Sequence, residues 1–317
     1  MLMIWGGVAV GLVILLLAGD ALVKGAVNLS LRVGIPALIV SLTIVAFGTS
    51  APELLISINA ALDDAPGIAL GNVVGSNTAN ILLVLGVPAL LAVMHTSQCN
   101  TRKSYVIMIA GSVLFIALAF RGVFDWIAGV ILLSVLAVIL GDAIREGLAH
   151  RRAGLEAEDE EEPEGADPDM PWWKIGLFLA LGLVGLPLGA DLLVDSSVEI
   201  AMIFGVTDTV IGLTLVALGT SLPELATTVM AALRRQADVA LGNVIGSNMF
   251  NLLAIIGVAS LIAPIPVDPE FLQFDLWVML GASLLIFPLV FLARDLTRLW
   301  GIALSALYLG YIAIVIM

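Results

Sequence analysis

The sequence predicts an all-α integral membrane protein with ten transmembrane helices, built as two five-helix repeats of inverted topology in which helices 2 and 7 are broken. Three observations predict this fold: the composition, a series of long apolar segments and an internal repeat. Of the 317 residues, 61% are hydrophobic and only 12% are charged, and the mean hydropathy is +1.12. Because soluble domains carry roughly 25% charged residues, we expect this chain to lie in a lipid bilayer.

Ten apolar segments follow one another along the chain, each close to the roughly 20 residues that a bilayer span requires. The first lacks the basic region of a cleaved signal peptide and is predicted to be a retained helix. A polar segment, 146–172, separates a first half, 1–145, from a second half, 173–317. The ten predicted spans lie near 3–27, 36–62, 68–93, 104–120, 123–145, 173–198, 206–232, 239–263, 273–293 and 297–317.

The two halves are copies of one another at an offset of 171 residues. GTSAPE at 48–53 matches GTSLPE at 219–224, and LGNVVGSN at 70–77 matches LGNVIGSN at 241–248. In this register 21 of the 41 positions from 46 to 86 are identical. Since each half holds an odd number of spans, the second copy is expected to enter the membrane with the opposite orientation.

The basic residues test this topology. Of the 13 Lys and Arg residues, Arg121 alone falls among the loops after spans 2, 4, 6 and 8, and the other twelve fall on the opposite side. Cytoplasmic loops carry the excess of basic residues, so we expect a protein of the plasma (inner) membrane with both termini outside and the 146–172 linker in the cytoplasm. Nine acidic residues between Leu155 and Met170 predict a disordered, solvated linker; a regulatory calcium sensor is the alternative, although EF-hand spacing is missing.

Prolines interrupt two of the predicted spans at matched positions. Pro52 lies in span 2 and Pro223 in span 7, where a proline removes a backbone donor and breaks the helix. Main-chain carbonyls around 46–49 and 217–220 are therefore expected to be available to a cation. Transporters with inverted repeats bind substrates near the bilayer midplane, at breaks of this kind.

A glutamate follows each of these prolines. Glu53 and Glu224 would be costly at membrane depth, and no Lys, Arg or His lies in the middle of a span to pair with them. A protonated glutamate, or one paired inside the bundle, is the alternative to a cation site. The hydroxyl and amide side chains around them are hard oxygen ligands of the kind that calcium takes, whereas copper and zinc recruit Cys or His. The asparagines of the GN and SN pairs serve either as ligands or as hydrogen bonds between helices.

The paired motifs resemble the two α-repeats of the calcium/cation antiporter superfamily, and within it the prokaryotic sodium/calcium exchanger branch. This resemblance implies the exchange of one Ca²⁺ for several Na⁺ by alternating access, with spans 1 and 6 sliding as a gating pair. It implies a midplane metal site between Glu53 and Glu224. The implied ligands are two carboxylates, six hydroxyl-bearing residues, two amides and two main-chain carbonyls: Glu53, Glu224, Thr49, Ser50, Ser76, Thr220, Ser221, Ser247, Asn80, Asn251, Ala46 and Ala217.

Several alternatives stay open. Some exchangers carry Asp at the position of Asn251, which leaves the stoichiometry open, together with selectivity among Ca²⁺, Mn²⁺ and Mg²⁺. A proton-coupled divalent-cation antiporter is the first alternative and a cation channel the second. No enzymatic activity, cofactor or nucleic-acid partner is expected, and no oligomer is required. Asp20 and its repeat mate Asp191 either form local ion pairs, as with Lys24 four residues on, or line an ion pathway.

Overall fold

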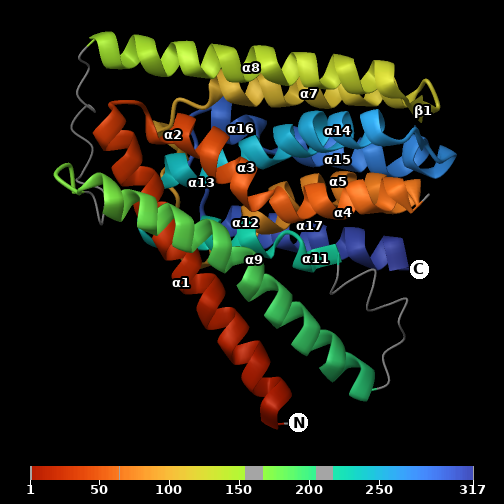
Figure 1. Ribbon diagram of the computed structural model, residues 1–317, viewed down its shortest axis with the longest axis horizontal. Helices are drawn as coiled ribbons and strands as arrows, with labels where there is room; N and C mark the ends of the chain where they lie inside the picture. The colour runs from red at the N-terminus through yellow and green to blue at the C-terminus, as the bar shows by residue number, and fades with distance from the viewer. Residues whose placement is uncertain (1, 64, 154–166, 205–216, 317) are drawn as a thin grey trace.

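The computed structural model describes residues 2–63, 65–153, 167–204 and 217–316, and these are mostly helical (Figure 1). Eight of the described helices are long and apolar enough to cross a membrane, or nine if a bent pair counts as one span. The elements of the first half are α1 (Leu2–Val33), α2 (Ala37–Val40), η1 (Ser41–Val45), α3 (Ala46–Thr49), α4 (Ala51–Leu62), α5 (Pro66–Ala79), η2 (Asn80–Val84), α6 (Gly86–Leu91), η3 (Thr96–Gln98), α7 (Arg102–Ala119), β1 (Val123–Phe124) and α8 (Trp126–Ala153).

The second half follows the same order. Its elements are α9 (Trp172–Ile203), α11 (Ala217–Gly219), α12 (Leu222–Leu233), α13 (Ala237–Met249), η5 (Phe250–Ile255), α14 (Ile256–Ile262), β2 (Ile265–Pro266), η6 (Phe271–Asp275), α15 (Leu276–Leu285), α16 (Phe287–Phe291) and α17 (Arg298–Ile316). Helix α8 continues eight residues into the segment that the sequence assigns to the linker. Most of the acidic stretch, 154–166, lies outside the described residues, so its predicted disorder stays a prediction.

Helices α1 and α9 pack along one another and cross the other helices obliquely (Figure 1). Each has 32 residues, or about 48 Å at 1.5 Å per residue, which exceeds the roughly 30 Å of a hydrocarbon core and is long enough to span it with tilt. Small residues allow the close packing. A Cβ on Gly11 would lie 2.7 Å from the Leu193 nitrogen, and one on Gly189 would lie 2.9 Å from the Leu15 nitrogen.

The centre of the bundle is formed by the helices that carry the two GNVxGSN motifs. In the apolar spans Pro66–Leu91 and Ala237–Ile262, 78% of one apolar 18-residue window is buried, compared with 17% of the window in α17. Both central spans change from α- to π-helix near matched asparagines, at Asn80 and at Phe250 next to Asn251. Segments of π-helix occur frequently at functional sites.

The main chain breaks where the sequence predicts. Between α2–α3 and α4 the chain bends by 46°, and Ser50 leaves the helical region with φ −84° and ψ 8°. Ser221 repeats this geometry before α12, with φ −89° and ψ 3°. The upstream part of the predicted span 206–232 lies outside the described residues.

Two short main-chain pairings connect the halves. Strand β1 lies between α7 and α8 and pairs in antiparallel orientation with β2, which follows α14. Met94, after α6, forms an antiparallel bridge with Leu296, between α16 and α17. Each pairing joins the loop after the central span of one half to the last loop of the other half. Main-chain hydrogen bonds therefore connect the two halves at both of these places.

Candidate functional site

Glu53 and Glu224 each lie in the first turn of a helix that begins immediately after a break. Pro52 occupies the start of α4 and Pro223 the start of α12, where a proline costs little because its missing N–H has no intrahelical partner. The amide groups at a helix N-terminus carry partial positive charge, which favours a carboxylate. Both glutamates are fully buried. The break therefore places each carboxylate where the main chain stabilises its charge.

The two carboxylates have different hydrogen-bond partners. Oε1 of Glu224 accepts hydrogen bonds from Ser50 Oγ at 3.1 Å and from Ser247 Oγ at 3.4 Å. Neither carboxylate oxygen of Glu53 has a hydrogen-bond partner within the described part of the chain. No ion pair among the described residues reaches either glutamate, so a basic side chain does not compensate the pair there.

Six side-chain oxygens of the predicted ligands are buried without a hydrogen-bond partner among the described residues. They are Oε1 and Oε2 of Glu53, Oε2 of Glu224, Oγ of Ser221, Oδ1 of Asn80 and Oδ1 of Asn251. A buried polar atom without a partner costs about 1–3 kcal/mol, and calcium takes six to eight oxygen ligands. The donor set contains no sulfur or imidazole, and no group of three or more His, Cys, Asp or Glu side chains gathers in the described residues. It fits a hard cation.

The two halves meet at this site. Thr49 Oγ1, at the end of α3, lies 3.3 Å from Asn243 Oδ1 and 3.4 Å from Ser247 Oγ, both on α13. Ser76 is buried on α5, and Thr220 lies at the turn between α11 and α12. The residues of the predicted set are therefore supplied by α3, α4, α5 and η2 of one half and α11, α12, α13 and η5 of the other.

One of the two predicted main-chain ligands, the carbonyl of Ala46, keeps its hydrogen bonds at the break. The carbonyl of Ala46 accepts hydrogen bonds from Ser50 N at 3.0 Å and Thr49 Oγ1 at 3.3 Å, so it is not freed by the break. The donor that Pro52 lacks would have reached the residue four positions upstream, Gly48. Ala217 begins α11 next to the residues that the structure does not describe.

The asparagines of the two GN pairs form hydrogen bonds between helices, one of the two roles predicted for them, but with partners that the sequence did not predict. Asn72 Nδ2 donates to the main-chain carbonyl of Glu53 at 3.1 Å and to Ser57 Oγ at 3.0 Å. Asn243 repeats this arrangement in the second half, with the carbonyl of Glu224 at 3.3 Å and Thr228 Oγ1 at 3.1 Å. These asparagines bind the main chain in the first turns of α4 and α12, at the two glutamates. Polar Ser57 and Thr228, each four residues after its glutamate, were the signal for them.

Asp20 forms the predicted ion pair and a second one that the sequence does not predict. It lies 2.9 Å from Lys24 Nζ and 2.5 Å from Arg234 Nε, which connects α1 to the end of α12. Its repeat mate Asp191 is exposed on α9. The matched positions therefore differ in their surroundings.

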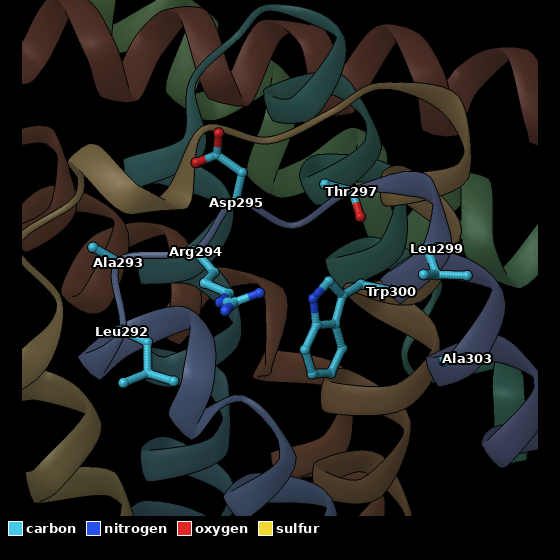
Figure 2. Close-up of a pocket in the computed structure, with 8 residues that line it drawn as sticks. All are labelled: Leu292, Ala293, Arg294, Asp295, Thr297, Leu299, Trp300 and Ala303. Atoms are coloured by element: carbon cyan, nitrogen blue, oxygen red, sulfur yellow. The ribbon is translucent and has the colours of Figure 1, made fainter.

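A separate cavity of about 720 Å³ lies at the loop between α16 and α17 (Figure 2). Arg294 and Trp300 point into it, whereas Asp295 points away and lies 3.0 Å from His95 Nδ1. No predicted ligand lines this cavity.

Comparison with known proteins gives consistent matches over most of the chain. The family model described as sodium/calcium exchanger protein matches residues 3–143 and 174–317. A putative antiporter CaxA from Alkalimonas amylolytica is 36% identical over 96% of both chains. The sodium/calcium exchanger MaX1 from Methanosarcina acetivorans is 32% identical over 96% of both chains.

The fold also matches solved structures. A structure of the sodium-calcium exchanger NCX_Mj, soaked with 10 mM Na⁺ and zero Ca²⁺, superposes with a TM-score of 0.83 at 32% identity and covers 99% of both chains. The resemblance that the paired motifs indicate is confirmed by these matches. The chain is a multi-pass membrane protein that belongs to the sodium/calcium exchanger protein family.

Proposed function

We propose that this protein is a secondary active antiporter that exchanges Ca²⁺ for Na⁺ by alternating access, and that both ions bind between Glu53 and Glu224. One observation supports this site most directly: two carboxylates from matched positions are fully buried, and three of their four oxygens have no hydrogen-bond partner among the described residues. A cation between them satisfies these oxygens and removes the repulsion. Sodium competes with calcium because it uses the same oxygens.

The proposal includes ten spans in two inverted repeats, 1–145 and 173–317, joined by an acidic cytoplasmic linker at 146–172. The main-chain pairings support the inversion. In both β1–β2 and Met94–Leu296, the loop after the central span of one half pairs with the last loop of the other half, and these loops lie on the same side of the membrane only if the second half is inverted. We place both termini outside the plasma membrane. The lipid bilayer is the only further partner required, and a monomer suffices.

A labelling experiment tests this orientation. Cys99 is the only cysteine of the chain and lies between spans 3 and 4, which the proposal assigns to the cytoplasm. Glu270 is exposed before span 9, on the other side. A membrane-impermeant maleimide added to intact cells is expected to label Glu270→Cys in a Cys99→Ala background and to leave wild-type Cys99 unlabelled until the cells are opened. The reverse pattern would overturn the orientation.

The transport proposal is tested by calcium-45 uptake into proteoliposomes. Vesicles loaded with sodium are expected to accumulate calcium, whereas potassium-loaded vesicles and protein-free liposomes are not. Uptake that requires a proton gradient and ignores internal sodium would move the protein to proton-coupled exchange, and calcium flux that continues without any counter-ion would indicate a channel.

A further inference from the structure

Asn77 on α5 and Asn248 on α13 occupy matched positions of the repeat and hydrogen-bond each other reciprocally. Nδ2 of Asn77 donates to the main-chain carbonyl of Asn248 at 3.2 Å, and Nδ2 of Asn248 donates to the carbonyl of Asn77 at 3.3 Å. Each residue is 1% exposed. Because both nitrogens are engaged, both amide groups have a fixed orientation, and each Oδ1 is presented away from this reciprocal pair.

The two Oδ1 atoms have different surroundings. Oδ1 of Asn248 accepts a hydrogen bond from Nδ2 of Asn80 at 3.0 Å. The matched bond would join Asn77 to Asn251, but Oδ1 of Asn77 and both amide atoms of Asn251 have no hydrogen-bond partner within the described residues. The bond between Asn80 and Asn248 is therefore formed, whereas the equivalent bond between Asn251 and Asn77 is not.

This difference determines which atom of Asn80 is available. Its nitrogen is held by Asn248, while its Oδ1 is fully buried and has no partner in the described part of the molecule. An amide whose nitrogen is fixed presents its oxygen in one direction, and carbonyl oxygens are good ligands for hard cations. Asn251 has no such constraint on either amide atom.

Building on the proposed function, we infer that Asn248 is a positioning residue that directs the Oδ1 of Asn80 at the cation, and that Asn77 does not do this for Asn251. The arrangement requires a hydrogen-bond donor at position 80. A carboxylate there has two oxygens and no donor, so it would meet Oδ1 of Asn248 oxygen to oxygen. A carboxylate at position 251 breaks no bond with Asn77.

The matched variants Asn80→Asp and Asn251→Asp separate this inference from simple charge attraction. Each adds one negative charge to the site, and attraction alone predicts that both lower the KM for calcium. We expect Asn80→Asp to raise the KM about ten-fold, because the fixed orientation is lost, and Asn251→Asp to lower it, because the added carboxylate attracts the cation and breaks no hydrogen bond. A KM that falls in both variants would overturn the inference.

A second pair of variants tests the positioning residue itself. Asn248→Ala and Asn77→Ala each remove one donor from the reciprocal pair, but only the first removes the partner of Asn80. We expect the calcium KM to rise about ten-fold in Asn248→Ala and no more than about three-fold in Asn77→Ala, with similar maximal rates. In an Asn80→Ala background, Asn248→Ala should raise the KM no further. Equal effects of the two single variants, or additive effects in the double variant, would contradict the inference.

The rise in melting temperature on adding calcium to the purified protein compares calcium binding by the same variants without a transport assay. If the wild type takes up no calcium in sodium-loaded vesicles, the proposed function fails. If the wild type is active and Asn80→Asp and Asn251→Asp shift calcium binding in the same direction, only the positioning role of Asn248 fails.

Discussion

Glu53 and Glu224 occupy matched positions of the internal repeat, and each begins a helix after a proline, yet their carboxylates have different neighbours. Glu224 accepts hydrogen bonds from Ser50 of the other half and Ser247 of its own half. Glu53 accepts none through its side chain within the described residues. Duplicated sequence thus gives duplicated backbone, but the side-chain contacts between the halves follow from how the halves pack. The matched pairs of the repeat therefore serve as internal controls for one another.

Removal of either charge is expected to have the largest effect. Glu53→Gln and Glu224→Gln should each lower sodium-dependent calcium uptake at least 100-fold, because the remaining carboxylate supplies only half of the charge. The two variants should differ in stability without calcium. Glu53→Gln is expected to melt a few degrees above Glu224→Gln. The first variant removes a buried charge that accepts no hydrogen bonds among the described residues, whereas the second weakens the hydrogen bonds that Ser50 and Ser247 donate to a charged oxygen. Uptake assays and melting curves with and without calcium check both points.

The serines before the two prolines give the next comparison. Ser50 Oγ donates to Glu224, whereas Ser221 Oγ is buried without a partner in the described residues. A hydrogen bond to a charged group contributes about 1.5–3 kcal/mol. Ser50→Ala should therefore lower the unfolding free energy of the calcium-free protein by that amount, and Ser221→Ala by much less. Equal destabilisation of the two variants in denaturant titrations would show that the hydrogen bond from Ser50 does not make the two matched serines differ in stability.

The sequence predicted the parts of this arrangement that depend on local chemistry. Prolines within apolar spans predicted the breaks, and the burial of Glu53 and Glu224 followed from their place in those spans. The partners of Glu224 were not predictable, because both halves carry the same GTS motif and only the packing of α3 on α13 brings one copy into reach. The ion pair of Asp20 with Arg234 was missed for the same reason, since 214 residues separate the two.

The asparagines behind the glutamates differ in burial, which gives a third comparison. Asn243 is fully buried, so Thr228→Val should leave one of its donors without a partner and cost about 1–2 kcal/mol. Asn72 is only partly buried, so we expect Ser57→Ala to cost about half as much. Thermal unfolding of the two variants beside the wild type measures the difference, and a larger loss in Ser57→Ala would contradict the assignment.

The smallest expected effect concerns the helix ends, where the repeat places opposite charges. Arg234 is the C-cap of α12 and pairs with Asp20, whereas the matched C-cap of α4 is the exposed Asp63. A helix C-terminus carries partial negative charge, which favours Arg and disfavours Asp. We expect Arg234→Gln to destabilise the protein by about 1 kcal/mol and Asp63→Asn to stabilise it by about 0.3–0.5 kcal/mol. Melting temperatures at low and high salt test the pair, because screening should reduce the gain from Asp63→Asn more than the loss from Arg234→Gln, whose ion pair is mostly buried. Opposite signs at low salt would follow from the charge at the helix end, whereas losses of equal size would indicate that both residues act through packing.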